Sequence, residues 1–148
     1  QYIPNVNHSL NGGYLNENLF SFYTRIINDQ VFPKLIWEIK NDSLISQVVT
    51  NQDYKVSIWR ANNEDTRDFR LWEEGKLWSQ TPLERNSLNK YKINLISNNS
   101  GYTATMLEFI FNPDSESPLK LTTGPYVTPN KYPYDSYIPN RVDVKKND

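Results

Sequence analysis

The sequence predicts a mainly β protein built as an immunoglobulin-like antiparallel β-sandwich. After residue 33, roughly seven or eight short runs of alternating apolar residues are separated by turn-forming residues. None of these runs has a helical period. Before residue 30, by contrast, apolar residues recur with the spacing of an α-helix. The change in period predicts a boundary near residues 30–34, between a helical N-terminal part and an all-β part.

The N-terminal part is predicted to hold an extended stretch, a polar turn and one amphipathic helix. Tyr2 to Val6 is extended, and residues 7–13 form a turn that ends in two glycines. The helix ends before Pro33, and its apolar stripe consists of Leu15, Leu19, Phe22, Tyr23, Ile26 and Ile27. Because nothing else in the chain has a helical pattern, we expect this stripe to pack against a partner that the chain lacks.

The all-β part is predicted from the alternation of apolar residues and from the turn residues between the runs. Strands are expected at residues 35–39, 44–50, 54–61, 69–72, 91–95, 103–111, 118–123 and 126–128. Residues 82–89 are expected to form a longer connection. The last residues combine prolines, tyrosines and charges without any period. The predicted divisions are therefore residues 1–31, a sandwich over residues 32–133, and an extended or disordered tail over residues 134–148.

Composition and charge argue against several classes of function. The chain has 16 basic and 17 acidic residues spread along its length, which argues against binding nucleic acid or an anionic membrane. No apolar run reaches the roughly 18 residues that span a bilayer, so we expect no membrane insertion. There is no cysteine, which rules out disulfides and thiolate chemistry. We predict no cofactor and no metal site.

The aromatic and charged residues after the third predicted strand suggest a structural cluster. Arg67, Asp68 and Arg70 place two guanidinium groups and one carboxylate around a single ring. We predict a half-buried ion pair that holds this loop against Trp59 or Trp72, and the alternative is a site for an anionic partner. The four tryptophans of the chain could line a carbohydrate-binding face, although packing in the core is the simpler interpretation.

Five short segments, in order and with similar gaps, resemble the C-terminal part of the PhoPQ-activated pathogenicity-related family. They are Trp59-Arg60-Ala61-Asn62, Arg67-Asp68-Phe69-Arg70, Trp78-Ser79, Gly101-Tyr102-Thr103-Ala104 and Leu121-Thr122-Thr123-Gly124. The resemblance runs from about Tyr2 to Pro133. It implies an N-terminal body similar to an α/β-hydrolase, of which residues 1–31 would be the last strand, loop and helix. We therefore expect this chain to be a fragment whose hydrolase-like body is missing.

The resemblance also implies a function, because secreted autocrine proliferation repressor proteins belong to this family. The chain is then expected to be the C-terminal part of a secreted, extracellular signal. That signal would restrain proliferation of the cells that release it, through a cell-surface receptor. Sequons at Asn7, Asn41 and Asn98 could accept glycans on a secretory route.

His8 supports a second, catalytic hypothesis. It is the only histidine, and it lies in a turn between the extended stretch and the helix. The family resemblance implies that this is the position of the general base of an α/β-hydrolase, where the serine and the acid precede the histidine. The chain would then be half of a serine hydrolase or peptidase active site, with nucleophile and acid upstream, and inactive by itself. The alternative is a surface histidine in a turn.

Overall fold

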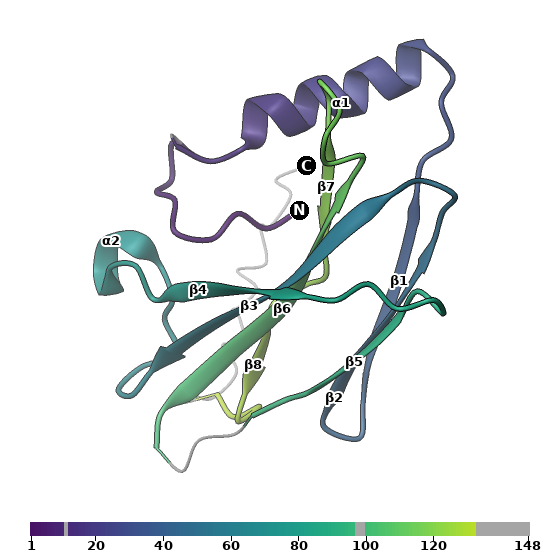
Figure 1. The fold of residues 1–148 in the computed structure, drawn as a ribbon. Coiled ribbons are helices and arrows are strands. Elements are labelled where there is room, and N and C mark those ends of the chain that lie inside the picture. Colours follow the sequence, from purple (N-terminus) through teal and green to yellow (C-terminus); the bar gives the residue numbers. More distant parts are fainter. Residues whose placement is uncertain (11, 97–99, 133–148) are drawn as a thin grey trace, which may run out of the picture.

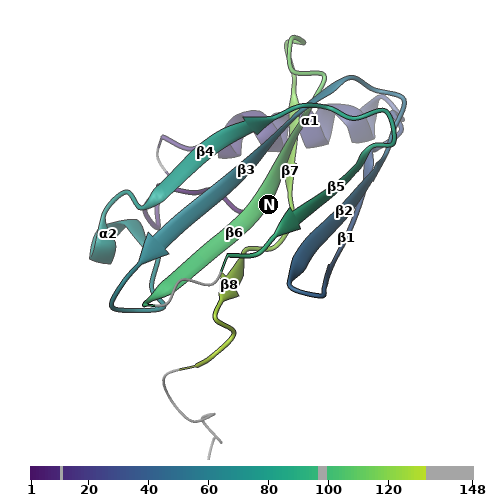
Figure 2. The same cartoon turned by 60° about the horizontal axis from the view of Figure 1, so that its bottom comes forward.

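The computed structural model describes residues 1–10, 12–96 and 100–132. In this part of the chain, two antiparallel sheets pack face to face, as Figures 1 and 2 show. The first sheet has the order β1 (Lys34–Lys40), β2 (Ser43–Val49) and β5 (Lys90–Asn94). The second has the order β4 (Trp78–Leu83), β3 (Tyr54–Asn63), β6 (Tyr102–Phe111) and β7 (Leu119–Thr122), and β8 (Tyr126–Thr128) also pairs with β6. The prediction of a mainly β protein is confirmed.

Turn residues fix the pairing of the first two strands. Asn41 and Asp42 have φ values of 48° and 51°, which Asn and Asp tolerate better than most residues and which two-residue hairpin turns require. The turn places Leu44 opposite Ile39 and Val48 opposite Leu35, so their side chains lie on one face. That face turns toward the second sheet and forms half of the core.

The core lies between the two sheets. It consists of Leu44, Val48, Tyr54, Val56, Ile58, Tyr91, Leu107, Phe109, Phe111 and Leu119. The ring of Tyr91 from β5 meets the ring of Phe109 from β6 edge-on, with a centroid distance of 5.6 Å. Burying one such side chain contributes about 1.5–3 kcal/mol, so this cluster is the main source of stability.

Two elements differ from the sequence prediction. Residues 69–72 do not form a strand, because Leu71–Glu74 is the short helix α2, whose two glutamates lie in its first turn where they complement the helix dipole. Strand β4 was not predicted as a strand. It lies at the edge of its sheet, where most of its side chains are exposed and Pro82 is tolerated, so it lacks the alternation of a strand with one buried face.

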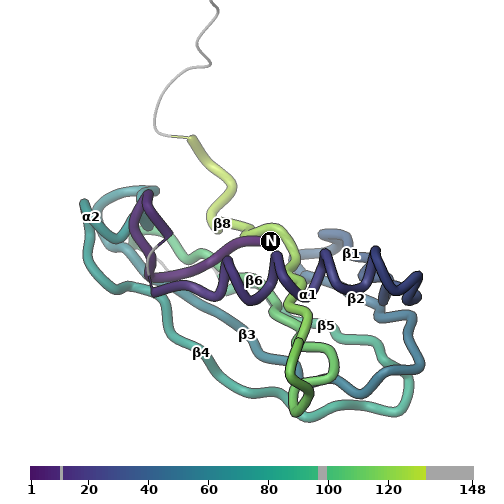
Figure 3. Tube along the Cα trace, turned by 90° about the horizontal axis from the view of Figure 1, so that it is seen from above, coloured from purple at the N-terminus to yellow at the C-terminus, as the bar shows by residue number. Residues whose placement is uncertain are grey.

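The N-terminal residues lie against the outer face of the second sheet. Helix α1 (Leu15–Ile27) crosses β7, which Figure 3 shows from above. Residues 1–10, of which 2–6 were expected to be the last strand of a hydrolase-like sheet, form no strand. A parallel strand needs neighbours with which to exchange hydrogen bonds, and the described chain pairs none with this segment.

Candidate functional site

His8 is exposed to solvent in the turn that precedes α1. The backbone N–H of Leu10 donates to the carbonyl of Asn7 at 2.9 Å, and Ser9 Oγ donates to Asn7 Oδ1 at 2.5 Å. In the described part of the chain, no group hydrogen-bonds to the imidazole. The described residues also contain no group of three or more His, Asp or Glu side chains that could hold a metal ion. The structure thus places His8 alone at the surface, and its assignment as a general base stays a prediction.

The segment that carries His8 is fixed to the second sheet by hydrogen bonds. The backbone N–H of Tyr2 donates to Thr122 Oγ1 at 2.9 Å. The side chain of Asn5 behaves like a strand partner of Trp78, because its Nδ2 donates to the Trp78 carbonyl at 2.8 Å and its Oδ1 accepts from the Trp78 N–H at 3.2 Å. The position of the turn is therefore set by β4 and β7.

Helix α1 has the predicted apolar stripe, but the stripe faces away from the sandwich. Leu19, Tyr23 and Ile26 are 56%, 62% and 55% exposed. The two residues of α1 that are buried are Ser21 and Arg25, at 0% and 4% exposure. Ser21 Oγ donates to the carbonyl of Ser117 at 3.0 Å, so the helix is attached through its polar face. An uncovered apolar stripe of this size is typical of an interaction surface.

The predicted ion pair forms between Asp68 and Arg70. Arg70 Nε donates to both carboxylate oxygens of Asp68 at 2.9 Å, and Nη2 also contacts Oδ2. The hydrogen bond from Arg70 lowers the pKa of Asp68. The side chain of Arg70 is 53% exposed and that of Asp68 is 24% exposed, so solvent reaches both partners of the pair. The Arg70 guanidinium also lies 5.3 Å from the Trp72 ring.

Arg67 and Trp59 do not join this pair. Arg67 Nη1 donates to the carbonyls of Pro129 and Lys131 at 2.9 Å and 3.3 Å, and its guanidinium lies 4.6 Å from the Tyr132 ring. Arg67 therefore ties the segment after β8 to the loop after β3. Trp59 is part of β3, beside Met106 of β6 and Gln80 of β4, and its buried Nε1 has no hydrogen-bond partner among residues 1–10, 12–96 and 100–132.

The three sequons fall in different surroundings. Asn7 and Asn41 are exposed, Asn7 in the turn that carries His8 and Asn41 in the β1–β2 hairpin turn. Asn98 lies outside the described residues. Whether any of them carries a glycan stays a prediction.

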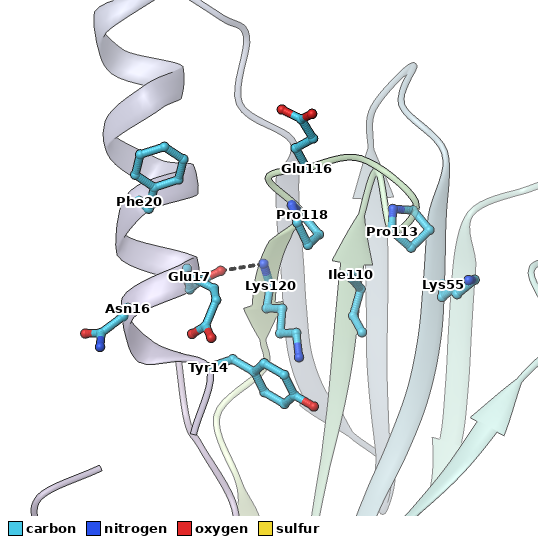
Figure 4. Close-up of a pocket in the computed structure, with 11 residues that line it drawn as sticks. Tyr14, Asn16, Glu17, Phe20, Lys55, Ile110, Pro113, Glu116, Pro118 and Lys120 are labelled. Atoms are coloured by element: carbon cyan, nitrogen blue, oxygen red, sulfur yellow. Dashed lines mark hydrogen bonds between the residues drawn. The ribbon is translucent and has the colours of Figure 1, made fainter. Parts of the chain in front are cut away.

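The sequence reasoning missed the cavity between α1 and the outer face of the second sheet (Figure 4). It has a volume of about 640 Å³, and its walls are mainly apolar, with Tyr14 and Phe20 on the helix side and Ile110 and Pro118 on the sheet side. Lys120 Nζ lies 3.0 Å from the centre of the Tyr14 ring, and burial lowers the pKa of Lys120. The lining also includes charged and amide side chains, among them Glu17, Lys55 and Lys120, so the cavity combines apolar walls with polar groups, as ligand sites do. Among the described residues that line it, no nucleophile is paired with a base. A lysine within the short apolar strand Leu119–Thr122 was the one available signal in the sequence.

One comparison with known proteins bears on the identity of the chain. Residues 1–70 match the model of the family described as PhoPQ-activated pathogenicity-related protein. This match supports the family that the sequence segments suggested, over residues 1–70. The match includes His8, α1 and the Arg67–Arg70 segment, whereas the later segments of the sequence resemblance, from Trp78 onward, lie beyond it. A search of curated proteins found no match, and neither did a search of solved structures.

The PhoPQ-related match spans two structural parts of the chain. It covers the N-terminal turn and α1, and it continues through the first three strands of the sandwich. The sequence pattern of the family therefore includes the junction between helix and sandwich.

The described residues contain no helix that is long and apolar enough to cross a membrane.

Proposed function

We propose that this chain is the C-terminal module of a secreted PhoPQ-related protein of the autocrine proliferation repressor type, carried on an α/β-hydrolase-like body. The observation that carries the proposal is the outward-facing apolar stripe of α1. A helix that is already anchored by polar contacts and still exposes Leu19, Tyr23 and Ile26 has a second surface to cover. We assign that surface to the hydrolase-like body that the family resemblance implies.

The sandwich is proposed to be immunoglobulin-like. Its first, second and fifth strands form one sheet, and its fourth, third, sixth and seventh form the other, in that order. In immunoglobulin-like domains the chain also passes between two antiparallel sheets, so that strands distant in sequence become neighbours. This strand order supports the assignment, and such domains commonly present loops for recognition.

The proposed role is that of an extracellular signal that restrains proliferation through a cell-surface receptor, with the sandwich as the recognition surface. The test is to add the folded chain to cells that release the protein, and to measure surface binding by flow cytometry and the rate of cell division. Heat-unfolded chain serves as the control. We expect binding that saturates and slower division with folded chain only. Folded chain that neither binds nor slows division would contradict the signalling role.

The two-part architecture has a separate test. Leu19→Glu with Ile26→Glu places two charges on the stripe, whereas Asn16→Glu places one on an exposed polar position of the same helix. We expect the isolated double variant to keep its melting temperature, because both side chains are about half exposed or more. Binding of the separately expressed hydrolase-like body should be lost in the double variant and kept in Asn16→Glu. Equal binding of the body by both variants would contradict the proposal that the body covers this stripe.

The catalytic hypothesis remains as a second candidate. His8 is exposed in a turn directly before α1, the helix whose apolar stripe we assign to the body. In that arrangement His8 would serve as general base for a serine supplied by the body. A fluorophosphonate probe should label the complete protein, and His8→Ala should abolish the label while Asn7→Ala leaves it. If the complete wild-type protein is not labelled, the hydrolase hypothesis fails and the architecture above is untouched.

A further inference from the structure

A second cavity, made mostly of polar residues, lies between the C-terminal half of α1 and the turn that joins β6 to β7. Its volume is about 290 Å³. Ser21, Thr24 and Arg25 line it from the helix, and Ser115, Glu116 and Ser117 line it from the turn. The site shares only Glu116 with the larger cavity of Figure 4, and it is separate from the turn that carries His8.

Arg25 is a buried cation without an anion. Its side chain is 4% exposed, and Nη1 donates a single long hydrogen bond, of 3.3 Å, to Gln52 Oε1. Its Nε is buried with no partner, and among the described residues no carboxylate oxygen lies within 4 Å of the guanidinium. Burial also lowers the pKa of Arg25. Because a buried guanidinium is costly unless it is paired, this group has unused capacity to bind an anion.

Ser117 supplies a second unused donor to the same cavity. Its Oγ is buried and has no hydrogen-bond partner in the part of the chain that the structure describes. Its carbonyl accepts the hydrogen bond from Ser21 Oγ at 3.0 Å, and Ser21 lies one turn before Arg25 on the same face of α1. Two residues with unpaired donors, from elements that are distant in sequence, therefore line one small space.

We propose that this cavity binds the phosphate or sulfate group of a ligand. A guanidinium has donors and no acceptor, so the partner must supply acceptors and, for charge balance, a negative charge. Arg25 reaches the cavity from the helix and Ser117 from the turn, and a tetrahedral oxyanion presents oxygens in several directions to donors of this kind. The volume of about 290 Å³ lies just below the usual range for ligand sites, which suits one small anionic group.

Glu116 provides a further test of the proposal, because it places a carboxylate at the rim of the site. It is exposed and forms no ion pair with Arg25 within 4 Å. Its charge opposes the entry of an anion. Removing that charge with Glu116→Gln is therefore expected to tighten anion binding, whereas a purely structural Arg25 would give no such response.

The test is the melting temperature of the 148-residue chain as inorganic phosphate replaces chloride at constant ionic strength. Phosphate stabilises proteins in general, so the specific part is the difference between variants. Arg25→Met removes the proposed ligand, and Arg85→Met is the control, since Arg85 pairs with Asp53 at the surface. We expect the melting temperature of the wild type and of Arg85→Met to rise and then level off with phosphate. In Ser117→Ala, the same rise should need at least about ten times more phosphate. In Arg25→Met, the melting temperature should rise only by the general effect of phosphate.

A direct readout keeps the proposal testable if Arg25→Met fails to fold. The nitrogen-15 resonance of Arg25 Nε–H should shift on titration with inorganic phosphate in the wild type, and the shift should saturate at lower concentration in Glu116→Gln. Titration with O-phosphoserine distinguishes a free anion from a phosphate group on a larger ligand, because only a site open to larger molecules accepts both. An Arg25 signal that moves with neither compound, or an equal phosphate response in folded Arg25→Met and Arg85→Met, would overturn the proposal.

Discussion

Asn18 of α1 holds the free edge of β7, because its Oδ1 accepts a hydrogen bond from the backbone N–H of Lys120 at 2.6 Å. Ser21 continues the attachment one turn later, where its Oγ donates to the carbonyl of Ser117. The helix therefore covers a sheet edge that would otherwise present unpaired backbone groups. Polar side chains make these contacts, so the apolar stripe stays available for another partner.

The first prediction concerns this attachment. Asn18→Ala with Ser21→Ala removes two hydrogen bonds that join α1 to the sandwich, and we expect a loss of about 1–3 kcal/mol in the free energy of unfolding. Asn16→Ala is the matched control, because Asn16 is exposed on the same helix. Urea unfolding measures the loss, and amide hydrogen exchange shows whether α1 opens first. Equal stability of the double variant and the control would mean that the polar face does not anchor the helix.

The sequence predicted those elements whose faces differ in burial. Strands β3 and β6 contain Val56, Ile58, Leu107 and Phe109, whose side chains point into the core, so their alternation was visible in the sequence. Strand β4 has no such face, and its pairing with β3 depends on backbone contacts that side-chain patterns do not reveal. Helix α1 was predicted from its stripe, and that stripe is exposed. The expectation that a missing part of the protein covers it stays a prediction.

The sites were less predictable, because they join residues that are distant in sequence. The period of α1 marked Ser21 and Arg25 as facing away from the stripe, and it gave no sign that this face is the buried one. Which face packs on the sandwich depends on where the β6–β7 turn lies, some ninety residues later in the chain. In the same way, Arg67 was expected beside Asp68 and instead reaches the backbone after β8.

Gly101 is predicted to be essential for the turn before β6. Its φ is +73°, and a Cβ there would lie 2.3 Å from the carbonyl oxygen of Asn63 and 2.4 Å from Glu64 Cα. Both are backbone atoms that cannot move aside. Gly101→Ala should therefore lower the free energy of unfolding by at least about 2 kcal/mol.

Gly75 provides the control for this effect. Its φ is +75°, and a Cβ there would meet no atom within 4 Å, so Gly75→Ala tests the backbone conformation without the steric clash. The ψ of Gly75 is −163°, a conformation found almost only at glycine, so we expect Gly75→Ala to cost about 1–3 kcal/mol, less than Gly101→Ala, where a clash adds to the strain. Thermal unfolding of the two variants gives the comparison. Similar losses in both would show that the turn at Gly101 can rearrange.

The tyrosine pair in the core predicts a loss of stability at high pH. The hydroxyl groups of Tyr54 and Tyr91 are 2.9 Å apart, and burial together with this hydrogen bond raises the pKa of Tyr91. A raised pKa gives stability that is complete below the ordinary value of 10.0 and is lost as the pH rises above it. Tyr91→Phe should cost about 1 kcal/mol at pH 8. The difference between wild type and variant should shrink above about pH 10.

Urea unfolding between pH 8 and about pH 11 measures this difference. Tyr2→Phe is the control, because Tyr2 is 53% exposed, and its stability should follow that of the wild type at every pH. A constant gap between wild type and Tyr91→Phe across this range would show that Tyr91 does not control the alkaline transition.

The Asp68–Arg70 pair predicts a change at acid pH. The pKa of Asp68 is lowered, mainly by its hydrogen bond with Arg70, so its contribution is present above the ordinary value of 3.8 and is lost as the pH falls below it. Because the pair is accessible to solvent, Asp68→Asn should cause only a small loss of stability at pH 7. That loss should disappear in acid and weaken in high salt, whereas Asp65→Asn, at an exposed position in the same loop, should show neither effect. Thermal unfolding across pH and salt measures both dependences. A large loss of stability that persists below about pH 3 would mean that Asp68 stabilises the loop through packing and hydrogen bonds that do not need its charge.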